Sequence, residues 1–262
     1  MEDRKYTEKY VAFIDILGFR AMLKEDGDNA SRISRLFDKI VTCKGVVSRV
    51  NRLTNNRNPA RTIEEARAKN SDDADYLQCY DAALNDMVIK IVSDSIILAV
   101  PVSDDFGFTA LVDACAYIAG FLIQNEEGYL VRGAITRGQV YFEEENVFFG
   151  EAYTRAYTLE EHSCIYPRII YEDNYELYPY ADSFGRTQTI KDEDGWGDID
   201  YIGNYLGTRD DLWLIDKEKK LRSIIDREIQ KNKGDLDVCA KYHWVESQIE
   251  RAREYVASRM NA

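Results

Sequence analysis

Two aspartates stand where a carboxylate is energetically costly. Asp15 lies inside the apolar run YVAFIDIL at 10–17, which then ends in a turn and is typical of a buried strand. Asp94 separates MVIKIVS at 87–93 from IILAVP at 96–101, a pattern that predicts a β-hairpin with Asp94 at its tip. An unpaired buried carboxylate costs on the order of several kcal/mol, so each side chain must reach an exposed edge or meet a cation.

Each aspartate alone also fits an ordinary residue at a turn or a strand end. On neighbouring strands, however, Asp15 and Asp94 would together offer the hard oxygen ligands that Mg²⁺ and Mn²⁺ prefer. Two such ions on a triphosphate stabilise both the attacking and the leaving oxygen of a phosphoryl transfer. The pair therefore predicts a two-metal phosphoryl-transfer site.

The elements that would position this site follow from the apolar spacing. Helices are expected over 30–50, 109–124 and 150–161, and two more in the last part of the chain, over 216–260; strands are expected at 129–142, 147–149 and 167–173, and a weaker one at 196–202. Gly138 marks a bulge or a close approach of backbone. This order mixes antiparallel hairpins with crossover helices, which predicts an α+β fold with a central, mostly antiparallel sheet flanked by helices.

The chain length allows one domain with a sizeable core and an appendage, since it has 262 residues. We expect the main domain at 1–210 and a C-terminal helical extension at 211–262. Residues 51–83 are polar, charged and poor in apolar side chains, so they predict a surface insertion in the main domain.

Composition excludes several classes of partner. A formal charge of −13 argues against nucleic acid, because binding its phosphates needs clustered Lys and Arg, whereas bound metals still permit a phosphate-bearing ligand. No run reaches the ~18 apolar residues that span a bilayer, and the N-terminus does not resemble a secretion signal. The five cysteines are not spaced as in metal-binding or redox motifs, so we expect free thiols in a cytoplasmic protein. The two histidines do not suggest a zinc site.

Four segments, in this order, resemble the motifs of class III nucleotide cyclases. They are FIDILGF at 13–19 for F-x-D-I-x-G-F, KIVSDSIILAV at 90–100 for K-x-I-G-D, LVRGAITRGQVY at 130–141 for R-x-G-I-x-x-G-x-V, and FGEAYTRAYTLE at 149–160 for W-G-x-x-V-N-x-A-x-R-M-E. Ser93 replaces the usual Gly of the second motif. The resemblance covers roughly residues 10–200, and the ordered set is more specific than any one motif.

This resemblance implies a ferredoxin-like cyclase domain that works as a head-to-tail homodimer with active sites shared between the two chains. Asp15, Asp94 and the backbone carbonyl of Ile16 would bind two Mn²⁺ or Mg²⁺ ions. The 3′-hydroxyl of a nucleoside triphosphate would attack its own α-phosphate, and pyrophosphate would leave. Phe19, which closes the first motif, is expected to contact the substrate.

The chain departs from the family at the transition-state residues. Thr154 and Thr158 stand where the family has Asn and Arg, and losing the arginine removes a cation that stabilises developing phosphate charge. Arg155 lies on a similar face of the expected helix and is our candidate substitute, although a solvated helix arginine is the alternative.

The residues expected to read the base also differ. Lys90 falls where adenylate cyclases place a base-contacting Lys, but the position of its Asp or Cys partner is Val147, which cannot hydrogen-bond a base edge. This altered pair points away from ATP and GTP. The DILGF, SDS and GEAY-x-RAY segments are similar to those of the bacterial pyrimidine cyclases of Pycsar anti-phage systems, whose cyclic UMP or cyclic CMP activates a separate effector protein.

UTP is therefore the first expectation and CTP the second. Because of Lys90, an adenylate or guanylate cyclase remains an alternative. Because of Thr154 and Thr158, a degenerate domain that binds nucleotide without turnover is another alternative. For the late-strand Lys that contacts the triphosphate in the family, the nearest candidate is Lys191, with Arg186 as a competitor; both also fit surface charges. Tyr153 would stack on or hydrogen-bond a pyrimidine, or else be a core or dimer-interface tyrosine.

Overall fold

The computed structural model describes most of the expected main domain and the C-terminal helices. The described residues are 6–25, 34–42, 79–80, 82–102, 106–143, 147–172, 174–175, 189–191, 194–208 and 213–260. Most of the polar insertion predicted at 51–83 lies outside them, and so does Arg186. The part of the 30–50 helix that is described, residues 34–42, is helical.

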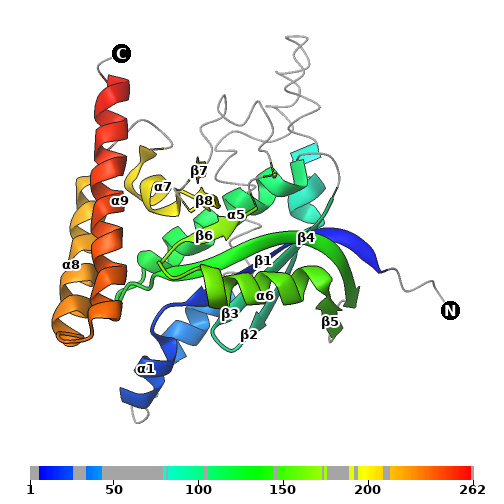
Figure 1. Ribbon diagram of the computed structural model, residues 1–262, viewed down its shortest axis with the longest axis horizontal. Coiled ribbons are helices and arrows are strands. Elements are labelled where there is room, and N and C mark those ends of the chain that lie inside the picture. The colour runs from blue at the N-terminus through cyan, green and yellow to red at the C-terminus, as the bar shows by residue number, and fades with distance from the viewer. Residues whose placement is uncertain are drawn as a thin grey trace.

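One mixed sheet forms the centre of the fold (Figure 1). Its order is β2-β3-β1-β4-β6-β8-β7, and β5 pairs with β4 off this path. Every pair is antiparallel except β4 with β6, so the prediction of a mostly antiparallel α+β sheet is confirmed. The strands are β1 (Thr7–Ile16), β2 (Val88–Val92), β3 (Ser95–Pro101), β4 (Val131–Glu143), β5 (Val147–Gly150), β6 (Ile169–Tyr171), β7 (Thr189–Lys191) and β8 (Gly197–Ile199).

The first four strands have the split βαβ topology. In chain order they are β1, β2, β3 and β4, and in the sheet their order is β2-β3-β1-β4, which is that of the ferredoxin-like motif. Helix α1 (Phe19–Glu25) lies between β1 and β2 in the chain, and α5 (Phe106–Ile123) lies between β3 and β4. The hairpin predicted around Asp94 is formed by β2 and β3.

Helix α5 fills the core on one face of the sheet. It is long and apolar enough to cross a membrane by length and composition, which corrects the expectation that no such run exists. However, 83% of this helix is buried inside the fold, where it packs on β1 and β3 with Phe108, Leu111 and Ile118 fully buried. This burial is typical of the central helix of a globular core.

Helix α6 (Glu151–Ser163) lies across the opposite face, over β1 and β4 (Figure 1). Its small residues Ala152 and Ala156 are fully buried against the sheet. A Cβ on Gly138 would lie 3.4 Å from the backbone nitrogen of Ala152, which is ordinary van der Waals contact, so the bulge or close approach expected at this glycine stays a prediction. The helix therefore packs at ordinary contact distance on β4.

Among the described residues, the helices that follow β8 are α7 (Tyr201–Leu206), α8 (Ile215–Lys231) and α9 (Leu236–Met260). Helices α8 and α9 lie side by side at one end of the molecule (Figure 1). They confirm the two helices expected over 216–260, and Leu221, Ile224, Ile225, Val245 and Ile249 are buried in the same core as α5. The boundary proposed at residue 210 stays a prediction.

Candidate active site

Asp15 and Asp94 meet at the end of the sheet. In the strand register Asp15 lies opposite Ser95 of β3 and opposite Arg132 of β4. Asp94 immediately precedes Ser95 in the hairpin turn, so the register brings its carboxyl group near that of Asp15, and the charge of Asp94 raises the pKa of Asp15. The Ser95 hydroxyl also donates to Asp15 Oδ1, at 3.4 Å. Two distant parts of the sequence thus place two carboxyl groups together.

The environment of Asp15 disfavours its own negative charge. Burial first, then the charges of Asp94 and Glu160, raise the pKa of Asp15 to about 7, while Arg132 opposes the shift. Carboxyl groups that repel one another in a half-buried place are stabilised by a divalent cation, which restores both to the ionised form. The pair therefore fits Mg²⁺ or Mn²⁺.

A main-chain oxygen lies beside this pair. The Leu17 N–H donates to the Leu130 carbonyl at 3.0 Å, on the β4 side of β1. No described peptide bond is cis, and in a trans peptide the C=O points opposite to the N–H. The Ile16 carbonyl therefore points toward the β3 side, where the turn with Asp94 lies, as expected for the third metal ligand.

Within the described ranges, no group of three or more His, Cys, Asp or Glu side chains is placed to hold a metal ion. The ligand set expected from the sequence needs only two carboxylates and the Ile16 carbonyl, and these are hard oxygen donors suited to Mg²⁺ or Mn²⁺. The residues present thus fit two ions that keep part of their coordination for water and a triphosphate.

Arg132 and Glu160 complete the charge arrangement, although neither was assigned a role from the sequence. Arg132 Nε forms an ion pair with Glu160 Oε1 at 2.5 Å and lies 3.9 Å from Asp15 Oδ2. Glu160 reaches this point from α6 and is only 3% exposed; burial raises its pKa. The signal for Arg132 was present, since a charged residue inside an apolar strand raises the same question as Asp15.

The hairpin turn that carries Asp94 has a strained backbone. Ser93 has φ +57°, and it is the one residue other than glycine with positive φ among those the structure describes. The left-handed region costs a residue with a Cβ about 1 kcal/mol or more, which explains why the resembling motif has glycine here. The chain keeps this turn conformation despite the substitution.

Lys90 lies on the same face of the sheet as Asp15. It pairs with Ile97, which in turn pairs with Phe13, two residues before Asp15. Strand spacings put the Lys90 backbone ~10 Å across the sheet and ~7 Å along it from that of Asp15. A long lysine side chain covers much of such a gap, so Lys90 is placed to reach the far end of a nucleotide whose phosphates lie at the aspartates.

Tyr153 packs as a core-facing aromatic residue. Its ring contacts Phe13 edge-on with centroids 6.1 Å apart and Phe148 with centroids 5.1 Å apart. These contacts match the alternative of a packed tyrosine, and its role with substrate stays a prediction. Tyr157, one turn further along α6, also contacts Phe13 but is largely exposed.

Arg155 lies away from the aspartates within the same chain. It forms an ion pair with Glu172 and lines a polar hollow with Glu8, Arg137 and Tyr175. Glu8 is near the start of β1, whereas Asp15 is near its end. If Arg155 acts on substrate, it does so in a site other than the one built by its own Asp15.

The other expected substrate contacts are also dispersed. Thr154 donates to the Gly150 carbonyl at 3.1 Å, and Thr158 is exposed on α6. Lys191 is exposed on β7, the strand at the far edge of the sheet, and Val147 begins β5. Phe19, at the start of α1, is half-buried and packs against the core next to the aspartate site.

Comparisons with known proteins yield distant structural matches. No protein-family model matches the chain, and no curated protein does. Among solved structures, the monomeric guanylyl cyclase domain of the RhoGC fusion protein from the aquatic fungus Blastocladiella emersonii is 13% identical, with 74% of this chain and 94% of that chain covered and a TM-score of 0.37.

Two other solved structures match to a similar degree. A bacterial light-regulated adenylyl cyclase is 12% identical, with 74% of this chain and 88% of that chain covered and a TM-score of 0.37. The catalytic core of a rhodopsin-guanylyl cyclase with converted specificity, in complex with ATPαS, is 14% identical, with coverages of 74% and 94% and a TM-score of 0.36. At these values the functional assignment rests on the site itself.

Proposed function

We propose that the chain is a nucleotide cyclase of the class III type that converts UTP into 3′,5′-cyclic UMP and pyrophosphate. The observation that carries the proposal is the meeting of Asp15 and Asp94 beside the Ile16 carbonyl, which together form a set of hard oxygen ligands. Arg132, in the same row of the sheet, adds a cation next to the place where a polyphosphate would lie.

In this proposal Asp15, Asp94 and the Ile16 carbonyl hold two Mn²⁺ or Mg²⁺ ions. When bound, the ions would supply positive charge that favours attack by the 3′-hydroxyl and departure of pyrophosphate. The new bond joins the 3′-oxygen to the α-phosphorus, the bond from that phosphorus to the bridging oxygen breaks, and the hydroxyl proton passes to solvent. Arg132 orients the phosphate oxygens through charge-assisted hydrogen bonds.

The choice of UTP rests on the altered base-reading pair. Lys90 is on the face of the sheet that carries Asp15, while Val147 offers no hydrogen bond to a purine edge. Uracil is smaller than a purine and has carbonyl oxygens that accept hydrogen bonds. A single lysine therefore suits uracil better than a Lys–Asp pair would. The alternatives are CTP, then ATP or GTP. The proposed role is second-messenger synthesis in anti-phage defence, with a separate effector protein that reads the product.

A head-to-tail homodimer accounts for the dispersed residues. Lys191 is on β7, at the far edge of the sheet from the β2–β3 hairpin, too far from Asp15 in one chain to share a substrate with it. A second copy would bring its own α6 to the face that carries Lys90. That face has exposed apolar side chains, since Val92 is 59% exposed and Tyr157 is 43% exposed. Burying them against a partner would favour association.

One assay separates these substrates. The purified protein is incubated with ATP, GTP, CTP or UTP and Mn²⁺, and the products are identified by mass spectrometry. Cyclic UMP as the main product supports the proposal, and turnover of ATP alone contradicts the pyrimidine assignment. Binding of nucleotide without any product would favour the degenerate domain that Thr154 and Thr158 suggest.

A further inference from the structure

A carboxylate interrupts the buried face of α6. Ala152 and Ala156 are fully buried against the sheet, and Glu160 follows at the same spacing of four residues. Residues at this spacing lie on one face of a helix, so a small or apolar side chain is expected at position 160. Glu160 is nevertheless buried with them. A buried carboxylate destabilises the folded state unless a cation compensates its charge, so Glu160 requires an explanation.

Arg132 supplies the compensating charge. Its Nε lies 2.5 Å from Glu160 Oε1, and among the charges that act on Glu160 it opposes the raised pKa most strongly. Both atoms are buried, and neither has a hydrogen bond with a group in the described part of the chain. The contact therefore depends on opposite charge and not on hydrogen-bond geometry. A neutral glutamine of the same shape should not be able to replace Glu160.

The contact with Glu160 keeps Arg132 from closing on Asp15. Arg132 Nε is 3.9 Å from Asp15 Oδ2, which is farther than its distance from Glu160. Asp15 lies directly opposite Arg132 in the strand register, so a closer ion pair between them is within reach. Without Glu160, the guanidinium would be drawn to Asp15 and would compete with a divalent ion for that carboxylate.

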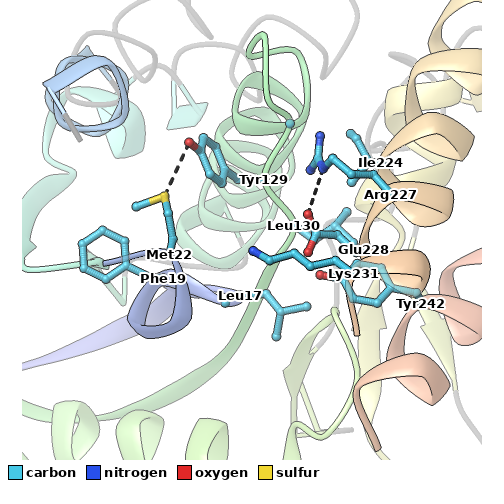
Figure 2. Close-up of a pocket in the computed structure, with 12 residues that line it drawn as sticks. Leu17, Phe19, Met22, Tyr129, Leu130, Ile224, Arg227, Glu228, Lys231 and Tyr242 are labelled. Atoms are coloured by element: carbon cyan, nitrogen blue, oxygen red, sulfur yellow. Dashed lines mark hydrogen bonds and ion pairs between the residues drawn. The ribbon is translucent and has the colours of Figure 1, made fainter. Parts of the chain in front are cut away.

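The backbone that carries Arg132 is held from two sides. The Leu17 N–H donates to the Leu130 carbonyl, which fixes this end of β4 on β1. Both leucines line a cavity of about 40 Å³ between the β1–α1 turn and α8 (Figure 2). Gly128 packs so closely on α8 that a Cβ there would be 2.1 Å from Ile224 Cδ1. The position of the guanidinium therefore depends on the partners of the Arg132 side chain.

We propose that Glu160 is a positioning residue that holds Arg132 for the phosphate oxygens of the substrate. Glu160 meets Nε, so the terminal nitrogens of the guanidinium remain for a phosphate group, whose geometry they match. The negative charge of Glu160 also keeps the guanidinium in place when divalent ions occupy the neighbouring carboxylates. The identity of the phosphate ligand rests on the proposed cyclase function, whereas the positioning of Arg132 does not.

The ion pair is tested without metal or nucleotide. NMR of the ¹⁵N-labelled full chain detects the Arg132 Nε–H, which exchanges slowly with water while it is buried. Glu160→Gln should speed this exchange at least about tenfold. Glu160→Asp keeps the charge and should retain part of the protection. Glu161→Gln is the matched control, because Glu161 is the next residue of α6 and is exposed. Equal protection in the wild type and the Glu160→Gln variant would overturn the proposal.

Phosphate positioning is tested with inorganic tripolyphosphate in excess Mn²⁺, whose binding calorimetry measures. Glu160→Gln should weaken this binding about tenfold and raise the KM for UTP by a similar factor, with a smaller effect on kcat. Arg132→Gln should cause at least the same loss, and Glu160→Gln should add little to it in the double variant. Additive losses would mean that Glu160 acts independently of Arg132, which contradicts a positioning role.

The outcomes also separate this role from the proposed function. If UTP is cyclised and the Glu160→Gln variant keeps the wild-type KM, the positioning role fails and the cyclase stands. If no nucleotide is cyclised, but Glu160→Gln still weakens tripolyphosphate binding only where Arg132 is present, the cyclase fails and the positioning role stands. Circular dichroism checks the folding of each variant. If Glu160→Gln does not fold, Glu160→Asp serves in the same comparisons, because its shorter side chain moves the carboxylate away from Arg132.

Discussion

Asp15 lies near the end of β1 and Asp94 in the turn between β2 and β3, yet the two carboxyl groups lie close enough that the charge of Asp94 raises the pKa of Asp15. The register Asp15↔Ser95 creates this relationship, because it aligns the end of β1 with the hairpin turn. Without a cation, the repulsion between the two carboxylates destabilises the folded state. This loss of stability can be measured.

Replacing Asp15 by Asn should abolish turnover and yet stabilise the metal-free protein at alkaline pH. The folded-state pKa of Asp15 is raised to about 7, well above the usual value of an aspartate near 4, so between these pH values the folded state holds a proton that the unfolded state has lost. The stability that Asp15 contributes is therefore present below pH ~4 and is lost as pH rises through ~7.

Thermal unfolding at pH 5 and pH 8 checks this prediction. At pH 8 without metal, the Asp15→Asn variant should melt a few degrees above the wild type, a shift that corresponds to about 1 kcal/mol. Added Mn²⁺ should raise the melting temperature of the wild type only. Asp216→Asn, at a side chain that is fully solvated, is the matched control. Equal melting temperatures of the Asp15→Asn variant and wild type at pH 8 would contradict the charge repulsion.

The strained turn at Ser93 makes opposite predictions for two substitutions. Ser93→Gly removes the cost of a Cβ at positive φ and should leave the free energy of unfolding unchanged or raise it by up to about 1 kcal/mol. Ser93→Val places a β-branched side chain in the same conformation and should lower it by about 1–3 kcal/mol. Urea unfolding measures both. A Ser93→Val variant as stable as wild type would show that the turn has relaxed.

Lys90 is predicted to contact the base and not the phosphates. Lys90→Ala should therefore raise the KM for UTP about tenfold and leave the apparent Mn²⁺ affinity unchanged, because Lys90 lies two strands away from Asp15. Lys24→Ala, on the exposed side of α1, should change neither quantity. A Lys90→Ala variant with weaker Mn²⁺ binding would place the lysine at the metals instead.

Much of the fold was predictable because local patterns determine it. Local sequence patterns are enough to predict three elements: the strand around Asp15, the hairpin around Asp94 and the helix at 109–124. The structure confirms them as β1, β2–β3 and α5. The pairing of the two aspartates also followed, since few sheet arrangements satisfy a carboxylate inside an apolar strand.

The rest of the site depends on contacts between distant segments. The ion pair of Arg132 with Glu160 requires the position of α6 over β4, which no local pattern encodes. The direction of Arg155 toward Glu172 likewise depends on how β6 ends. The cavity that Leu17 and Lys231 both line forms only when α8 packs near the turn that follows β1. Such features require the tertiary structure.

Arg155 gives the sharpest test of the shared site. If it supplies the missing transition-state cation, it must leave Glu172 to meet substrate bound to the partner's metals, and Arg155→Ala should lower kcat about 100-fold. Glu172→Gln weakens the competing ion pair, so kcat should be retained or rise. Arg137→Ala is the matched control, since Arg137 pairs with Glu8 in the same hollow and is equally exposed. Equal losses in the Arg155→Ala and Arg137→Ala variants would mean that the hollow is structural and that another residue supplies the cation.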